Sequence, residues 1–290
     1  MNLIEINEHT KNMEVGERLR LTGIPDNIYH ATNGIGSTNL KRFIESPAGF
    51  RFGDGFEQKD CFDLGSAVHT LVLEPHLFDD AYVMMPETIP RKAGKKWDMF
   101  KEMNEGMTIL KPSDMAAAQS MADSVMTTHA QYFTAGQAEV SYWYKAPVEE
   151  SYDGGGYVLI KARVDYEIDD LAIDLKTTAD AHPKKFESKA IDFGYHIQNQ
   201  LYILATGLSD FVFVVVNNKK PYQVVGPMMF TDNAKELGLL KVQQGLIDLR
   251  DCMITNDWPN YLGVNDGEII EMDLKNWHYR ELEELQSKYY

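Results

Sequence analysis

Two short apolar segments, each carrying an acid, constrain the fold of this chain more than any other feature. They are Ala162-Arg163-Val164-Asp165 and Ala172-Ile173-Asp174-Leu175-Lys176. Because side chains at i and i+2 of a strand share a face, Asp174 and Lys176 are predicted to be neighbours, with Leu175 pointing into a core. A turn at residues 167–170 would bring Asp165 alongside. The pattern predicts two carboxylates and an ammonium at one edge of a β-sheet.

Such a cluster has a definite chemistry. Hard cations such as Mg2+ prefer oxygen ligands, which carboxylates supply. A lysine beside a bound metal suits water activation or charge stabilisation at a phosphate. An ordinary hairpin with charged surface residues explains this segment equally well when it is taken alone.

Composition limits the class of protein. A chain of 290 residues, 44% hydrophobic and 25% charged, fits one large globular domain or at most two. The net charge of −16 excludes a globally basic surface but leaves room for a local basic channel. Cys61 and Cys252 lack metal-ligand spacing and read as small apolar residues in a reducing compartment. The polar N-terminus and the shortness of the longest strand-like apolar run, Phe211–Val216, predict a cytoplasmic protein without a membrane span.

The chain divides by pattern into an N-terminal arm and a single domain. Residues 1–27 belong to a loosely ordered arm that continues to about residue 35, and residues 28–290 form the domain, with core motifs at 65–230 and a C-terminal helical extension at 231–290. Helices are expected at 39–45 (capped by Ser37 or Thr38), 64–73, 112–128, 184–208, 233–253 and 276–288. Strands are expected at 139–145, 157–165, 171–176, 211–217 and 222–230, and a mobile basic loop within 86–112. This order predicts a mixed α/β fold with a partly antiparallel sheet.

Other residues can be placed around the Asp174 edge. His69 lies on the helix at 64–73, Gln198 and Tyr202 share a helix face at i and i+4, and Glu139 begins a strand. Each has an ordinary explanation, as a packed histidine, a polar helix surface or a solvated glutamate. Their combination, in this order, is harder to explain that way.

The combination resembles a known family. Asp165 with Asp174-Leu175-Lys176 resembles the PD-(D/E)xK nuclease signature, and Gly65, His69, Glu74, Gln198 and Tyr202 resemble the extra motifs of its RecB-like exonuclease branch. Over residues 28–230 the chain is similar to the nuclease domains of the exonuclease VIII (RecE) family, most closely at 66–75, 174–178 and 195–202. Val164 replaces the family's usual proline, and Asp174 stands where many members carry glutamate. The resemblance implies a restriction-endonuclease-like α/β core, with a central mixed sheet flanked by helices.

The resemblance also implies roles for individual residues. His69, Asp165 and Asp174 would bind Mg2+, for which Mn2+ can substitute, and Glu139 would hold a second metal or a water. The carbonyl of Leu175 is a further candidate ligand. Lys176 would orient or deprotonate the attacking water, although a base role requires a lowered pKa. Gln198 and Tyr202 would position the scissile phosphate or Lys176.

Substrate and partner expectations follow from the same resemblance. Arg42, Ser46 and Arg51 are candidates for a 5′-phosphate pocket, and Trp97, within the basic stretch 91–101, is a candidate for base stacking, although a solvated loop fits that stretch as well. The implied activity is 5′ to 3′ degradation of double-stranded DNA ends in recombination and repair, by a ring-shaped homo-oligomer acting with a single-strand annealing protein. The alternatives are a single-strand nuclease or endonuclease, a non-catalytic DNA-binding module, and an enzyme acting on small phosphorylated substrates.

Overall fold

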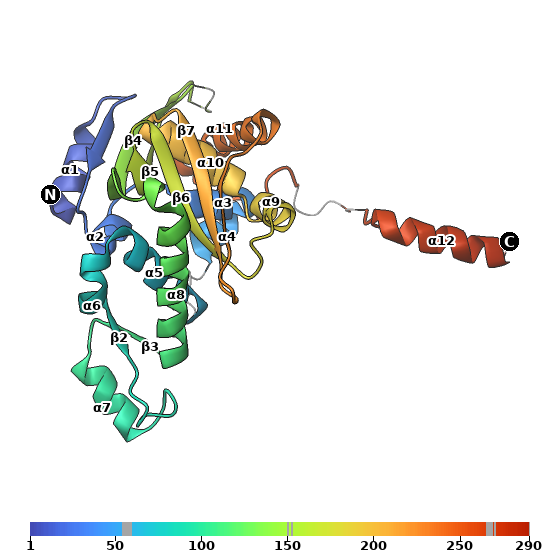
Figure 1. Cartoon of the computed structure of the whole chain (residues 1–290). Coiled ribbons are helices and arrows are strands. Elements are labelled where there is room, and N and C mark those ends of the chain that lie inside the picture. The colour runs from blue at the N-terminus through green and yellow to red at the C-terminus, as the bar shows by residue number, and fades with distance from the viewer. Residues whose placement is uncertain (54–59, 150, 152, 265–268, 270, 290) are drawn as a thin grey trace.

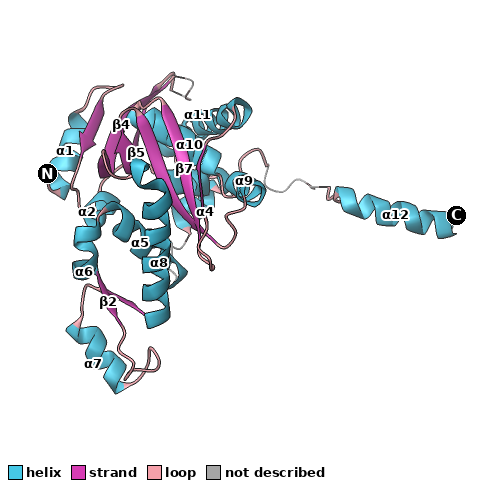
Figure 2. Ribbon diagram, in the orientation of Figure 1, coloured by secondary structure: helices cyan, strands magenta, loops and turns pink. Residues whose placement is uncertain are grey.

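A computed structural model of the chain describes residues 1–53, 60–149, 151, 153–264, 269 and 271–289. Its centre is a six-stranded sheet in the order β1-β4-β5-β6-β7-β8, with helices on both faces (Figure 1, Figure 2). Its strands are β1 (Arg18–Leu21), β4 (Gln137–Val148), β5 (Gly156–Ile168), β6 (Leu171–Thr178), β7 (Asp210–Asn217) and β8 (Val224–Met228). Only β6 and β7 are parallel neighbours, and the other pairs are antiparallel. The predicted mixed α/β fold with a partly antiparallel sheet is confirmed.

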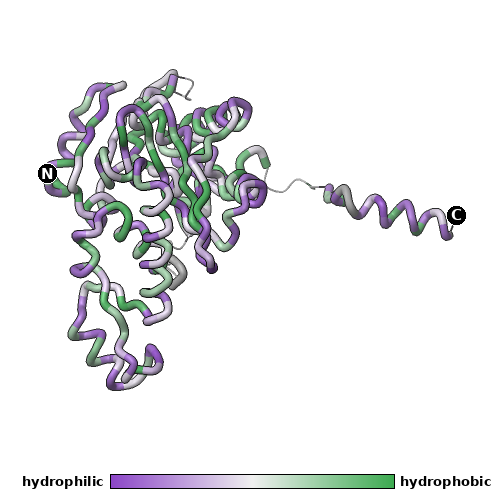
Figure 3. Tube along the Cα trace, in the orientation of Figure 1, coloured by the Kyte–Doolittle hydropathy of each residue, from purple (hydrophilic) through white to green (hydrophobic). Residues whose placement is uncertain are grey.

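The sheet is buried on both faces near its centre. On β7, Val212, Val214 and Val216 pack on one side, while Phe211 and Phe213 pack on the other. The first side is covered by α5 (Asp60–Leu73) and α8 (Pro112–His129). The opposite side is covered by α3 (Ser37–Glu45), α9 (Pro183–Asp192), α10 (Tyr195–Thr206) and α11 (Asp232–Thr255). Figure 3 shows the hydrophobic residues gathered along these central strands.

β5 and β6 pair over only three residues before they separate. Tyr166 pairs with Ile173, but the ladder does not continue to the next pair, Asp165 and Asp174. Two antiparallel strands that diverge at this point leave a gap lined by their own side chains. Asp165 and Asp174, the two acids that the sequence placed together, are the first residues beyond the last β5–β6 pair.

The basic stretch within 86–112 is not the mobile loop that we expected. It contains α7 (Lys95–Met103), and β2 (Tyr82–Met84) and β3 (Thr108–Leu110) on either side pair in parallel. Trp97 and Phe100 pack against a small apolar cluster of Met85, Ile89 and Ile109. This cluster gives the segment a core of its own, and it extends away from the main sheet in Figure 1.

The expectation of a loosely ordered N-terminal arm is also wrong. α1 (Leu3–Asn12) begins with a capping box between Asn2 and Glu5, and β1 joins the main sheet beside β4. Buried lysines of the sheet hold this region in place. The Lys145 ammonium donates to the carbonyls of Lys11 (3.1 Å) and Met13 (2.7 Å). Contacts between residues so distant in sequence leave no local signal, which is why the pattern suggested an arm.

Helix boundaries differ from expectation at two glycines. The helix expected at 184–208 is two helices, because Gly194 adopts φ +66° and separates α9 from α10. α3 begins at Ser37 with Gly36 as its N-cap, rather than at Asn39 after a serine or threonine cap. The remaining helices of four or more residues are α2 (Asp26–Ala31), α4 (Pro47–Phe52), α6 (Phe78–Ala81) and α12 (Asn276–Tyr289). α12 lies apart from the body of the molecule (Figure 1). Within the described ranges, no helix is long and apolar enough to cross a membrane.

We predict that Lys161→Met will destabilise the fold. The Lys161 ammonium donates to the carbonyls of Tyr29 (2.9 Å), His30 (3.2 Å) and Thr32 (2.7 Å), at the end of α2. Its loss should lower the free energy of unfolding by about 2–4 kcal/mol, because charged hydrogen bonds to buried carbonyls are among the stronger ones. Urea unfolding at pH 7 measures the change. Lys11→Met, at an exposed lysine of α1, is the control and should change little. Equal stability of the two variants would contradict the prediction.

Candidate active site

A buried ion pair on β6 forms the centre of the site. Asp174 and Lys176 share a face as predicted, and Lys176 Nζ lies 2.5 Å from Asp174 Oδ2. Leu175 points the other way into the core. Asp174 is only 2% exposed, so its charge depends on partners supplied by the protein rather than by water.

Gln198 supplies the second partner of Asp174. Its Nε2 donates to Asp174 Oδ1 at 2.7 Å, from the buried face of α10. Tyr202 lies one helical turn further along, with its ring edge-on to Phe211. Burial raises the pKa of the Tyr202 hydroxyl well above its ordinary value, and a hydrogen bond with Gln198 opposes that shift. The predicted common face of Gln198 and Tyr202 is confirmed, and Gln198 contacts Asp174 there.

Asp165 lies across the gap from this pair. Its Oδ2 accepts the backbone N–H of Leu175 at 2.8 Å, where the β5–β6 ladder has already ended. His69 Nδ1 approaches the same oxygen at 3.5 Å from α5. That helix lies close to β6 because Gly65 faces Thr177, where a β-carbon would come within 3.2 Å of the threonine hydroxyl. The absence of a side chain at Gly65 therefore helps to bring His69 to the site.

Glu139 completes the cluster through an irregularity in β4. The β4–β5 register passes from Ala138 to Val140 and leaves Glu139 unpaired, with φ +52°. A glutamate rarely adopts this conformation, which redirects its side chain out of the regular ladder. Arg163 Nε lies 3.7 Å from its Oε2. The sequence had suggested that Glu139 begins a strand, but it lies inside β4.

The donor set fits a divalent metal ion. One ligand atom each from His69, Glu139 and Asp165 can be chosen so that all lie within 4.8 Å of one another. The carboxylates suit Mg2+ or Mn2+, and the imidazole suits later first-row metals. Asp174 is not part of this group, because its two oxygens face Lys176 and Gln198. Of the four predicted ligands, three are brought together, and Asp174 would have to share an oxygen with its present partners.

Burial shifts the pKa of three ionisable groups of the site, Glu139, Asp174 and Lys176. Burial, reinforced by the charge of Asp165, raises the pKa of Glu139 to about 8. Burial also raises the pKa of Asp174, while the Lys176 ammonium opposes that shift. For Lys176 itself, burial lowers the pKa, but Asp174 and Asp165 outweigh it and leave the pKa raised. The lowered pKa that a lysine base would need is therefore not found in the metal-free protein.

Two further residues, Tyr195 and Lys41, lie beside Lys176 and were not predicted from the sequence. The Tyr195 ring centroid lies 4.9 Å from Lys176 Nζ and 5.7 Å from Lys41 Nζ. Both residues fall inside segments that carried the family resemblance. Their types alone gave no signal, because tyrosines and lysines on helices are usually surface or core-edge residues.

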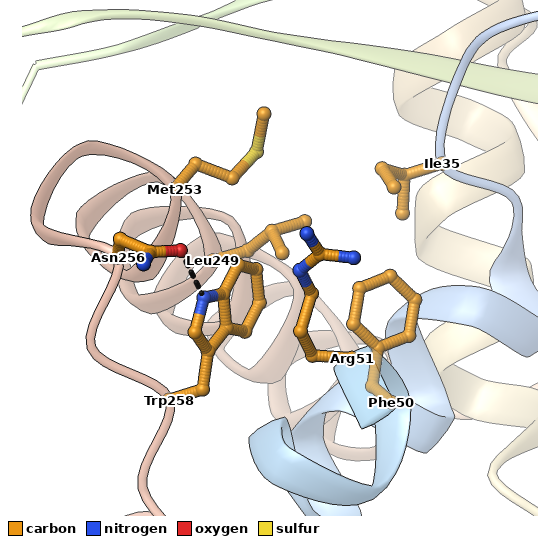
Figure 4. A pocket seen from close by; sticks show the side chains of 7 residues that line it. All are labelled: Ile35, Phe50, Arg51, Leu249, Met253, Asn256 and Trp258. Atoms are coloured by element: carbon orange, nitrogen blue, oxygen red, sulfur yellow. Dashed lines mark hydrogen bonds between the residues drawn. The ribbon is translucent and has the colours of Figure 1, made fainter. Parts of the chain in front are cut away.

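The group of described residues that could hold a metal includes none of the four residues predicted to contact DNA. Ser46 Oγ caps α4 by accepting the N–H of Gly49 (2.9 Å) and donates to the carbonyl of Asn260 (2.8 Å). Arg51 lies over the Trp258 ring in a cavity of about 370 Å³ (Figure 4). Arg42 is half-buried on α3, and Trp97 belongs to the small cluster around α7. Their roles in DNA binding stay predictions, and the observed contacts of Ser46 and Trp97 are structural.

This fold and cluster define the class of the protein. A mixed sheet, an aspartate beside an Asp-x-Lys strand, and helices that bring His69 and Gln198 to that strand are the features of a PD-(D/E)xK nuclease. The chain belongs to the family described as a PDDEXK-like domain of unknown function (DUF3799), whose model matches residues 36–268.

A solved structure agrees with this fold. The crystal structure of a protein named "putative exonuclease", from Eubacterium rectale, has a TM-score of 0.52 and 12% sequence identity, over 89% of this chain and 98% of that chain. A phage-related exonuclease from Haemophilus somnus 129PT has a TM-score of 0.33 and 14% identity, over 77% of this chain and 96% of that chain. At 12% identity the likeness to the Eubacterium rectale protein concerns the fold alone. The TM-score of the Haemophilus somnus protein is too low to indicate a shared fold. No curated protein matches the sequence.

We predict that metal affinity will rise with pH between 7 and 8. With a pKa of about 8, Glu139 is mostly protonated at pH 7 in the metal-free protein, and a metal ion must displace that proton. The apparent affinity should rise about fivefold from pH 7 to pH 8 and level off above that. Calorimetric titration with Mn2+ in buffers of different ionisation enthalpy measures both the affinity and the released proton. Glu139→Gln should bind more weakly and lose this dependence, and an unchanged pH profile in that variant would contradict the prediction.

Proposed function

We propose that this protein is a divalent-metal-dependent exodeoxyribonuclease that degrades linear double-stranded DNA from its ends, 5′ to 3′, with Mg2+ as the metal. The observation that carries the proposal is the juxtaposition of the buried Asp174–Lys176 pair with His69, Glu139 and Asp165. This arrangement offers one group of residues to bind a metal and a separate ammonium for a phosphate. Both are needed to hydrolyse a phosphodiester.

The residues divide the work of hydrolysis. His69, Asp165 and Glu139 would hold the metal ion, which would neutralise phosphate charge and favour ionisation of water. Lys176, kept protonated by Asp174, would stabilise the negative charge that builds on the phosphate oxygens. Gln198 acts as a positioning residue, because it fixes the carboxylate that fixes Lys176. Water adds to phosphorus, the P–O3′ bond breaks, and the leaving 3′ oxygen takes up a proton.

Three observations support the choice of substrate and pathway. The first is the resemblance to exonuclease VIII domains over residues 28–230. The second is the fold likeness to the Eubacterium rectale protein. The third is the negative net charge, which suits a protein whose contacts with DNA are confined to one region. We propose action in cytoplasmic recombination and repair, as a ring-shaped homo-oligomer that leaves one strand for a single-strand annealing protein.

We predict that Lys176→Ala will abolish cleavage without abolishing metal binding. Removal of the ammonium removes the group that stabilises phosphate charge, so the rate should fall at least about 100-fold. The substrates are linear duplex DNA labelled at one 5′ end and a covalently closed circle, each with Mg2+, Mn2+ or EDTA. Lys11→Ala is the control and should cleave like the wild type.

The outcomes separate the alternatives. Metal-dependent loss of linear but not circular DNA supports an end-dependent enzyme, and early release of the 5′ label supports the proposed polarity. Cleavage of the circle would instead indicate an endonuclease. A preference for single strands would indicate a single-strand nuclease. Retained DNA binding with no cleavage of any substrate would overturn the proposal in favour of a non-catalytic module.

A further inference from the structure

Lys41 stands beside the site without a role in the metal cluster. It lies on α3, and its Nζ donates to the carbonyl of Phe193 at 3.2 Å. Its Nζ also lies 5.7 Å from the Tyr195 ring centroid, whose distance to Lys176 Nζ is 4.9 Å. Two ammonium groups therefore contact one aromatic ring next to Asp174.

The charge of Lys41 is poorly compensated. Among the described residues, no carboxylate lies within ion-pairing distance of its Nζ, and its protein contacts are one carbonyl and one ring. Burial and the nearby Lys176 ammonium lower the pKa of Lys41, and the charge of Asp174 opposes that shift only in part. A buried ammonium without a nearby counter-ion is stabilised when an anionic ligand binds to it.

The chain leaves space for this lysine. Gly194 has φ +66°, and a β-carbon there would lie 2.8 Å from Lys41 Cδ. The turn between α9 and α10 therefore follows the lysine stem closely. A hydrogen bond to one carbonyl does not by itself require a charged side chain at this position.

We propose that Lys41 binds a backbone phosphate of the DNA strand next to the scissile phosphate. The ammonium would exchange part of its contact with the Phe193 carbonyl for a phosphate oxygen. Lys176 would remain on the scissile phosphate, and Tyr195 would separate the two cations. This inference rests on the proposed function, since it takes DNA as the ligand.

The test measures DNA binding without cleavage. A short fluorescent duplex with a 5′-phosphate is titrated in EDTA at several salt concentrations, with Lys41→Met, Lys41→Arg and the control Lys11→Met. Lys41→Met should bind about tenfold more weakly whatever the sequence, and the slope of log affinity against log salt should fall by about 1. Lys41→Arg should retain most of the affinity, because it keeps the charge. With metal present, Lys41→Met should raise KM far more than it lowers kcat.

The outcomes separate this inference from the proposed function. Wild-type affinity and salt slope in Lys41→Met would overturn the inference, as would an equal loss in Lys41→Arg. If Lys41→Met unfolds, Lys41→Gln gives the same comparison with a polar side chain. The wild-type protein could fail to cleave DNA while Lys41→Met still lowers the affinity and the salt slope. That result would support the phosphate contact and reject the nuclease activity. If the wild-type enzyme cleaves DNA and Lys41→Met binds DNA with unchanged affinity and salt slope, the nuclease activity is supported and the phosphate contact is rejected.

Discussion

The buried pair of Asp174 and Lys176 is the constraint on which the rest of the site depends. Taking two charges out of water costs several kcal/mol for each ion, which is recovered only with good geometry and further hydrogen bonds. The 2.5 Å ion pair with Lys176 and the hydrogen bond from Gln198 offset this cost for Asp174. The position of α10 against β6 is therefore fixed by electrostatics as well as by apolar packing. Removing Gln198 would leave Asp174 Oδ1 without a hydrogen-bond donor. Gln198 therefore influences the Lys176 ammonium through Asp174.

The divergence of β5 and β6 separates two kinds of acid. Asp174 is sealed on the α10 side, where its oxygens are held by protein groups. Asp165 and Glu139 lie in the gap with His69 and keep lone pairs for an ion. A regular ladder would have closed this gap with backbone hydrogen bonds. The N–H of Leu175 instead donates to the Asp165 side chain, so the strands stay apart without leaving that donor unpaired.

Local periodicity explains what the sequence could predict. The i, i+2 rule placed Asp174 beside Lys176, and the i, i+4 rule placed Gln198 with Tyr202, because both depend only on strand and helix geometry. The left-handed conformation of Glu139 had no such signal, because it interrupts the β4–β5 ladder at a single residue without shifting its register. The same holds for Lys161, whose partners lie about 130 residues away. Contacts across the fold, rather than local preferences, decide these positions.

The charge of the site argues for a particular role of Lys176. In the metal-free protein two nearby carboxylates hold its proton, and nothing in the surroundings favours the neutral amine enough to reverse this. A metal ion bound by His69, Asp165 and Glu139 would weaken that hold, because its charge offsets the carboxylates. An incoming phosphate is itself an anion and would strengthen it again. With substrate present, Lys176 would therefore remain a cation, and in the proposed hydrolysis it would stabilise charge rather than remove a proton from water.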